Sequence, residues 1–106
     1  MRPQPALRRW DGASPPTREA ILQRFREEGL EPHAWANGPY DHYAAHRHPY
    51  HKVLYAVRGS ITFITYPDRT AYELRAGDRL DLPPGTEHSA DVGPDGVECV
   101  EAPRYA

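Results

Sequence analysis

The chain has 106 residues, a formal net charge of −2 and a mean hydropathy of −0.80. This length suffices for one domain around a single hydrophobic core. The near-neutral charge gives no electrostatic reason to expect a nucleic-acid partner, and without a long apolar run we expect no membrane span.

Compartment and stability are indicated by a few residue types. The N-terminal residues lack an apolar segment, so we expect no secretory signal. Cys99 is the only cysteine, which excludes an internal disulfide and predicts a cytoplasmic location. The chain has 12 prolines, and Lys52 is its only lysine. Frequent proline restricts the unfolded chain and favours a thermophilic protein, although genome base composition would give the same bias.

The first third of the chain predicts an arm followed by a helix. Residues 1–13 mix Arg, Pro and Gly without periodicity and are expected to form an N-terminal arm. Residues 14–29 predict a helix, with Ser14 as the N-cap, two prolines in the first turn and Gly29 at the end. The apolar residues Ile21, Leu22 and Phe25 form one stripe, so the helix is expected to cover either its own barrel or a partner.

The rest of the chain predicts a single all-β domain, which with the helix spans residues 14–106. An edge strand is expected at residues 30–36, because Pro32 cannot donate a hydrogen bond. Short β-rich segments then alternate with turn residues, at 40–48, 51–58, 60–66, 70–74, 79–82, 87–92 and 97–102. This spacing predicts an antiparallel sandwich or barrel over about residues 30–102.

Two segments carry histidines suited to one metal ion. His46 and His48 are two residues apart, so on an extended backbone their imidazoles leave the same face. The second segment, residues 83–88, ends in His88 directly after a Pro-Pro-Gly turn. Imidazoles from two strands that meet in a barrel can bind a transition metal.

These two segments resemble the two motifs of the cupin superfamily. In the first motif the chain supplies His46, His48 and the closing Gly59, and in the second it supplies Gly77, Pro83, Gly85 and His88 at the family's spacing. The resemblance implies a jelly-roll β-barrel with one N-terminal helix, a metal in the barrel mouth and a homodimer. It covers roughly residues 34–102.

The chain departs from the family pattern at the glutamate ligand, where it has Lys52. A protonated lysine has no lone pair and cannot bind a metal. The adjacent His51 could replace the glutamate ligand, because Pro49 breaks the strand and the inward–outward alternation of side chains need not continue past it. The other interpretation is that His51 is an exposed residue at the strand edge. A site of His46, His48, His88 and His51 would be all-imidazole and would suit one divalent ion of Zn, Ni, Fe or Cu.

Three further residues are predicted to line a substrate pocket: Tyr50, Lys52 and His42. An inward Lys52 would attract an anionic ligand, whereas an outward one would be a surface cation. If the strand is regular, His42 points to the same side as His46 and lines the pocket. The alternative is a structural histidine at the end of the barrel. Tyr50 offers a phenol, but aromatic residues in strands usually serve packing.

Two function classes follow from the resemblance. The first is a metal-dependent enzyme, oxygenase-like (including dioxygenases) or isomerase-like, that acts on a small organic molecule. The second is a non-enzymatic module that binds or senses a small ligand or a metal. The fold does not decide whether the protein is an enzyme.

Overall fold

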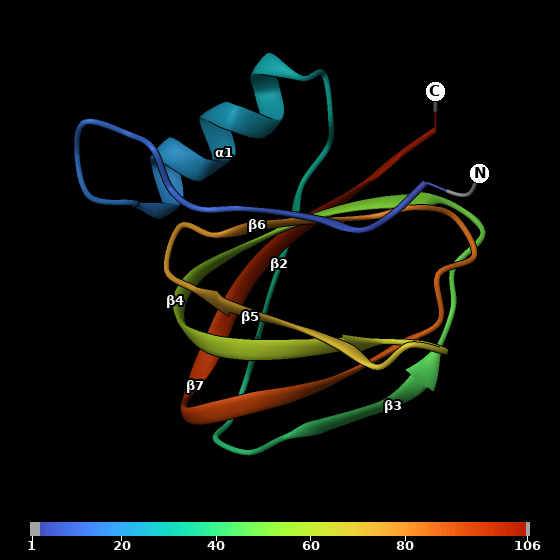
Figure 1. The fold of residues 1–106 in the computed structure, drawn as a ribbon. Coiled ribbons are helices and arrows are strands. Elements are labelled where there is room, and N and C mark those ends of the chain that lie inside the picture. Colours follow the sequence, from blue (N-terminus) through green and yellow to red (C-terminus); the bar gives the residue numbers. More distant parts are fainter. Residues whose placement is uncertain (1–2, 106) are drawn as a thin grey trace.

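A computed structural model describes residues 3–105 (Figure 1). Seven strands form an antiparallel sheet that closes on itself, and one helix lies outside it. The elements are β1 (Ala6–Arg8), α1 (Arg18–Glu27), β2 (His33–Asn37), β3 (His42–His46), β4 (His51–Thr65), β5 (Thr70–Arg75), β6 (Arg79–Leu82) and β7 (His88–Arg104). The predicted all-β cupin-like barrel with one N-terminal helix is confirmed.

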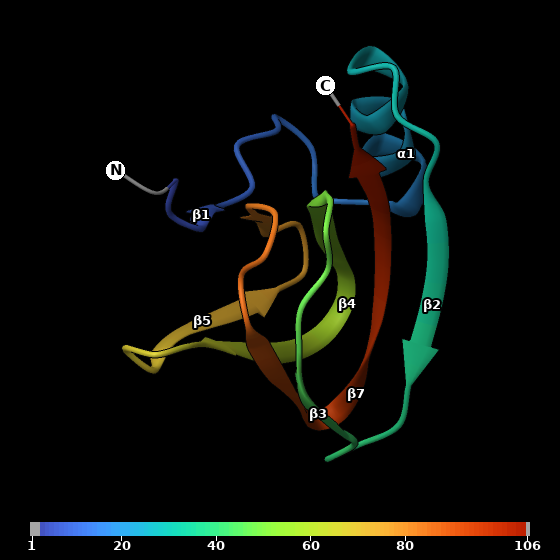
Figure 2. The same ribbon diagram turned by 90° about the vertical axis from the view of Figure 1, so that its right-hand side faces the viewer.

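Two long strands, β4 and β7, are the centre of the sheet. They pair with each other along nearly their whole length, β6 and β5 add to β4, and β2 and β3 add to β7. Both strands curve strongly, so each contributes to two walls of the barrel (Figure 2). A histidine near the start of β7 can therefore face a histidine on β3.

Each long strand replaces two strands predicted from the sequence. The segments 51–58 and 60–66 were expected to be separated by Gly59, and 87–92 and 97–102 by a Gly-Pro-Asp-Gly turn. Gly59 and Gly96 have φ values of 74° and 76°, which bend the strands without ending them. A Cβ on Gly59 would lie 2.0 Å from the carbonyl oxygen of Gly96, so the bend also needs the missing side chain.

The N-terminal segment is more ordered than the expected arm. Its strand β1 pairs antiparallel with β6, which places Leu7 opposite Leu80 and against the barrel core. The helix begins at Arg18, and its N-cap lies three residues after the predicted Ser14. Thr17 is the N-cap, because its Oγ1 accepts a hydrogen bond from the Ala20 N–H at 3.1 Å.

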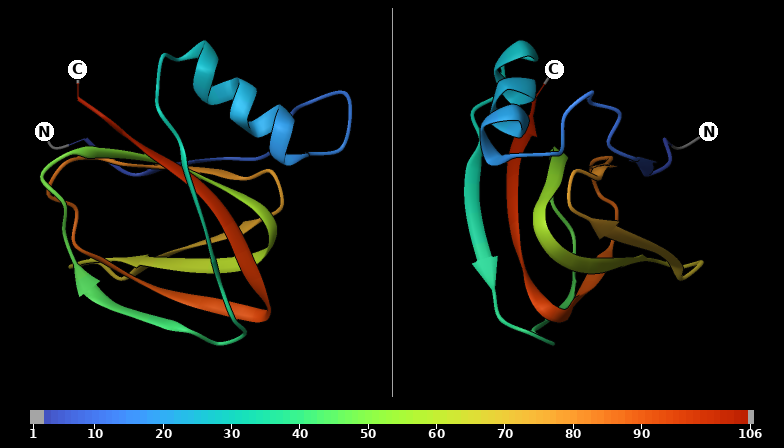
Figure 3. Two further views of the ribbon diagram at one scale, coloured as in Figure 1. Left: turned by 180° about the vertical axis from the view of Figure 1, so that it is seen from behind. Right: turned by 90° about the vertical axis from the view of Figure 1, so that its left-hand side faces the viewer.

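The core has two parts, separated by the wall that β4 and β7 form. Along β4, Leu54 and Ala56 point into the barrel, whereas Val53 and Tyr55 point out toward α1. Phe25 of α1 packs on Tyr55, with ring centroids 5.3 Å apart. The apolar stripe of the helix thus covers its own barrel, outside the strands (Figure 3).

None of the helices within residues 3–105 has the length and apolar character needed to cross a membrane.

Candidate metal and ligand site

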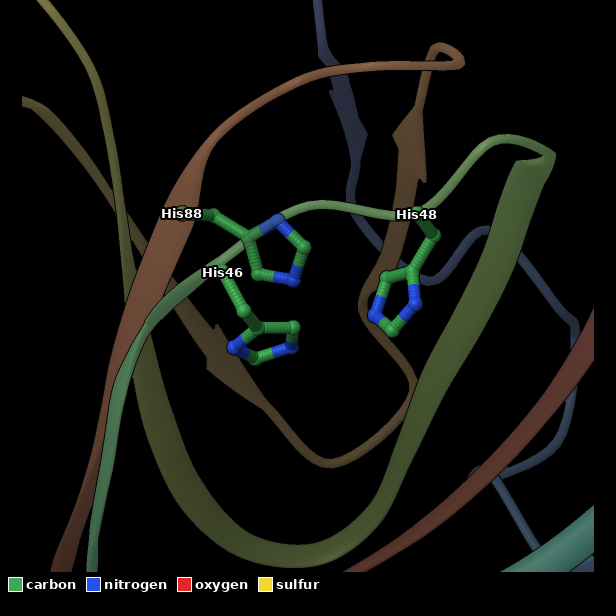
Figure 4. Close-up of side chains that lie close together, drawn as sticks. All are labelled: His46, His48 and His88. Carbon is green, nitrogen blue, oxygen red and sulfur yellow. The ribbon is translucent and has the colours of Figure 1, made fainter.

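Three histidines lie close together: the exposed His46 at the end of β3, the half-buried His48 two residues later and the buried His88 at the start of β7. We call them the histidine cluster. One ring nitrogen from each lies within 4.8 Å of the other two, and the three side chains point toward one another (Figure 4). The pairing of β3 with β7 causes the convergence, because it puts His46 directly opposite His88.

Backbone hydrogen bonds fix the tautomer of two of these rings. His46 Nδ1 lies 2.7 Å from the Ala44 carbonyl oxygen, and His88 Nδ1 lies 2.9 Å from the Thr86 carbonyl oxygen. A carbonyl oxygen only accepts, so each Nδ1 carries the hydrogen and donates it. Nε2 therefore keeps its lone pair. Histidines that bind a metal commonly donate the N–H of the other ring nitrogen in this way.

Burial keeps the inner members of the histidine cluster neutral. It lowers the pKa of His88 to about 4, to which the nearby His46 and Lys52 also contribute. Burial lowers the pKa of His48 as well, helped by Lys52 and His46. Both rings are therefore unprotonated at neutral pH, the form that can bind a metal.

The buried His88 predicts a pH dependence of the stability of the metal-free protein. Its pKa is about 4 in the folded protein against an ordinary value of 6.5. Between these values the unfolded chain takes up a proton that the folded chain does not, so stability falls as the pH falls. The difference between the two pKa values corresponds to roughly 3 kcal/mol of unfolding free energy. This contribution is fully lost at about pH 4.

Urea unfolding with a chelator present, at several pH values from neutral down to about pH 4, measures this loss. The matched variant is His88→Gln, whose amide can still donate to the Thr86 carbonyl but does not titrate. We expect its stability to fall less steeply with decreasing pH. Parallel curves for the two proteins would show that His88 does not cause the slope.

The histidine cluster forms one wall of a cavity of about 250 Å³. Most of the other lining side chains are apolar, and two of them, Lys52 and Glu101, form an ion pair. The lining residues are Trp35, Tyr43, His46, His48, Lys52, Leu54, Phe63, His88, Ala90 and Glu101. The cavity therefore combines imidazole rings, other aromatic rings and one ion pair that is largely shielded from solvent.

Lys52 points into this cavity, with a side chain only 10% exposed. Its Nζ lies 3.2 Å from Glu101 Oε2 and 3.3 Å from His48 Nε2. The outward, surface-cation interpretation of Lys52 is thus wrong. The charge is compensated within the cavity, because Glu101 supplies a carboxylate.

Glu101 is a site residue that the sequence interpretation missed. It lies on β7, and its Oε1 accepts a hydrogen bond from Trp35 Nε1 at 2.6 Å. The signal that could have found it is strand parity, since Glu101 is two residues after the buried Cys99. It does not belong to the group of potential ligand atoms around the histidine cluster.

His51, one of two interpretations of which made it a fourth ligand, lies outside the histidine cluster. Its Nε2 is 2.8 Å from Asp81 Oδ2, on the opposite side of β4 from Lys52. The strand begins at His51, so regular alternation applies from this residue on, and an inward Lys52 requires an outward His51. Pro49 interrupts the strand too early to change this parity.

His42 and Tyr50 also lie away from the cavity lining. An irregularity between Tyr43 and His46 shifts the register of β3, so Tyr43 lines the cavity and His42 faces out, with Nδ1 2.7 Å from Asp91 Oδ1. Tyr50 packs on the ring of His48, at a centroid distance of 5.1 Å. It supports the histidine cluster from the side.

Comparison with known families places this geometry in context. Residues 19–99 match the family model of the AraC-like ligand binding domain. The chain belongs to this family. The domain is cupin-type, which confirms the predicted membership of the cupin superfamily. No curated protein matches the sequence.

Solved structures show the same fold in proteins with different roles. An RmlC-like cupin from Shewanella frigidimarina is 25% identical, with a TM-score of 0.62 over 73% of this chain and 67% of that chain. Drosophila melanogaster CENP-C bound to CAL1 is 15% identical, with a TM-score of 0.64 over 69% and 63% of the two chains. A DMSP lyase from Ruegeria pomeroyi is 19% identical, with a TM-score of 0.64 over 71% and 38%.

Proposed function

We propose that the protein binds one divalent transition metal ion through Nε2 of His46, His48 and His88, and binds a small organic molecule in the adjoining cavity. At His48 the ion would take the place of Lys52 Nζ, which lies 3.3 Å from Nε2. The observation that carries the proposal is the convergence of three ring nitrogens within 4.8 Å, two of them on rings whose Nδ1–H groups are held by backbone carbonyls.

The donor set fits a borderline metal ion. Imidazole nitrogens bound to one zinc ion lie about 3 to 4 Å apart, since each is about 2.0 to 2.1 Å from the ion. Small side-chain rotations would bring the histidine cluster to this spacing. Three neutral imidazoles favour Zn, Ni, Fe or Cu, whereas Mg and Ca prefer oxygen ligands. When bound, such an ion acts as a Lewis acid toward the ligand.

A metal-dependent enzyme is one form of this function. The cavity has room for a small molecule beside the histidine cluster, and its lining includes the apolar side chains of Trp35, Leu54 and Phe63. An oxygenase-like reaction would need a redox-active ion, and an isomerase-like reaction would not. The lyase among the structural neighbours supports an enzyme only at the level of the shared fold.

A non-enzymatic ligand-binding module is the second candidate. The family description names a ligand binding domain, which favours this function for residues 19–99. Such a module would use the same cavity and histidine cluster without turnover. A homodimer, as expected from the cupin resemblance, would suit either role.

Metal analysis of protein purified without added metal tests the proposal. We expect about one ion per chain, and a calorimetric titration of chelator-treated protein with Zn²⁺ or Ni²⁺ should recover one site. Bound iron or copper, seen in the electronic spectrum, together with oxygen consumption would favour the oxygenase. Absence of any metal binding in the titration would contradict the proposed metal site.

A further inference from the structure

The Lys52–Glu101 ion pair faces the cavity instead of solvent. Both side chains line the cavity, and they are only 10% and 22% exposed. Because the two charges are 3.2 Å apart, they compensate each other, and the pair presents neither a free cation nor a free anion to a ligand.

The pair still has hydrogen-bonding capacity on its cavity side. The ammonium of Lys52 has three N–H donors, and within residues 3–105 its contacts are to Glu101 and His48. The carboxylate of Glu101 has about four acceptor positions, of which Lys52 and Trp35 use two. A donor and an acceptor therefore lie side by side, ready for a group that has both.

The size and lining of the cavity restrict the kind of ligand that could present a hydrogen-bond donor and acceptor to the pair. A dry cavity of about 150 Å³ is sufficient for benzene. The cavity here measures about 250 Å³ and has Trp35, Tyr43 and Phe63 in its walls. An aromatic ring with one small polar substituent matches both the volume and the apolar lining.

We propose that the Lys52–Glu101 pair selects a small aromatic carboxamide. The carbonyl oxygen of the amide would accept a hydrogen bond from Lys52, and its N–H would donate one to Glu101. This inference rests on the proposed function, because it assigns the ligand class of the same cavity.

A neutral amide is preferred to a charged ligand for an energetic reason. A carboxylate would be attracted to Lys52 and repelled by Glu101, and an ammonium group would experience the reverse. Each would add a third buried charge without a partner of its own, whereas an amide finds both its donor and its acceptor matched.

Three ligands of nearly the same shape separate these cases: benzamide, benzoate and benzylamine. Binding to chelator-treated protein at neutral pH can be followed by NMR of the indole N–H groups. Trp35 Nε1 donates to Glu101 and reports on the pair, whereas Trp10 Nε1 donates to the Ser14 carbonyl and serves as an internal control. We expect benzamide to bind about tenfold more tightly than the other two, and to shift the Trp35 signal alone. Equal binding, or a preference for benzoate or benzylamine, would overturn the inference.

Two variants test that the pair causes the preference. Glu101→Gln leaves Lys52 uncompensated, so benzoate should become the tightest ligand. Lys52→Met leaves Glu101 uncompensated, so benzylamine should become the tightest. An unchanged Trp10 signal shows that each variant is folded, and an unchanged order of the three ligands in both folded variants would contradict the assigned role.

Failure of this inference and failure of the metal proposal can be distinguished, because the ligands are tested on chelator-treated protein. Selective benzamide binding without any metal uptake would overturn the metal proposal and leave the pair's role intact. Metal uptake at the histidine cluster together with no benzamide selectivity would overturn only the pair's role.

Discussion

Replacing His48 with alanine is expected to lower the affinity for Zn²⁺ or Ni²⁺ by roughly 100- to 1,000-fold. The estimate follows from four-ligand zinc sites, where a binding free energy of about 10 to 16 kcal/mol corresponds to about 3 or 4 kcal/mol per ligand. His48 is only partly buried, so its loss should leave the barrel folded. Calorimetric titration and metal analysis of the purified variant measure the change.

His42→Ala is the matched control for this experiment. His42 belongs to β3, like His46, but it pairs with Asp91 outside the barrel and is not part of the histidine cluster. Its replacement should leave the metal stoichiometry near one. Unchanged metal content in His48→Ala, or an equal loss in His42→Ala, would contradict the site as assigned.

The sequence predicted the parts of this site that depend on spacing within a strand and on the two cupin motifs. His46, His48 and His88 were expected to meet, and the antiparallel pairing of β3 with β7 brings their ring nitrogens together. The fold followed from regular alternation and turn residues, which are local properties. Metal binding itself stays a prediction.

The parts that failed depend on where a strand starts or shifts its register. His42 was placed by assuming regular alternation, but the irregularity in β3 exchanges it for Tyr43. The position of His51 was left open by Pro49, and it is decided by the pairing of β4 with β6 and β7 from Lys52 onward. The pattern of residues along the sequence does not reveal these hydrogen bonds, because they join strands that are far apart in the chain.

Glu101 shows a different limit. The missing family glutamate was sought next to Lys52 in sequence, whereas the carboxylate beside Lys52 comes from β7, 49 residues later. Neighbouring strands bring such residues together, so a lost ligand and its electrostatic replacement need not be close in the chain. The inward lysine and this glutamate are best understood as one feature.

The second large effect is expected at Arg79, whose guanidinium connects α1 to the barrel. Its side chain is only 6% exposed. It donates to Asp81 at 2.6 and 3.1 Å and to both carboxylate oxygens of Glu28, which follows α1. His51 contacts Asp81 and Arg104 contacts Glu28, which extends the ion pair into a network.

Arg79→Met should destabilise the protein by about 3 to 5 kcal/mol, because it leaves the buried carboxylate of Asp81, and the partly exposed one of Glu28, without their main partner. The exposed Arg75 is the matched control: it contacts Glu73 with both side chains more than half exposed, so Arg75→Met should change stability by less than about 0.5 kcal/mol. Urea unfolding at neutral pH compares the two variants.

The pH dependence identifies the cause of the Arg79 effect. Hydrogen bonds from Arg79 lower the pKa of Glu28. Burial alone would raise the pKa of Asp81, but the hydrogen bonds from Arg79 and His51 hold it below its ordinary value of 3.8. The stability that these carboxylates contribute is therefore present above about pH 4 and is lost as they become protonated at lower pH. The difference between the parent and Arg79→Met should shrink when the pH falls below 4, whereas a difference that is constant with pH would indicate lost packing of the long side chain instead of lost charge pairing.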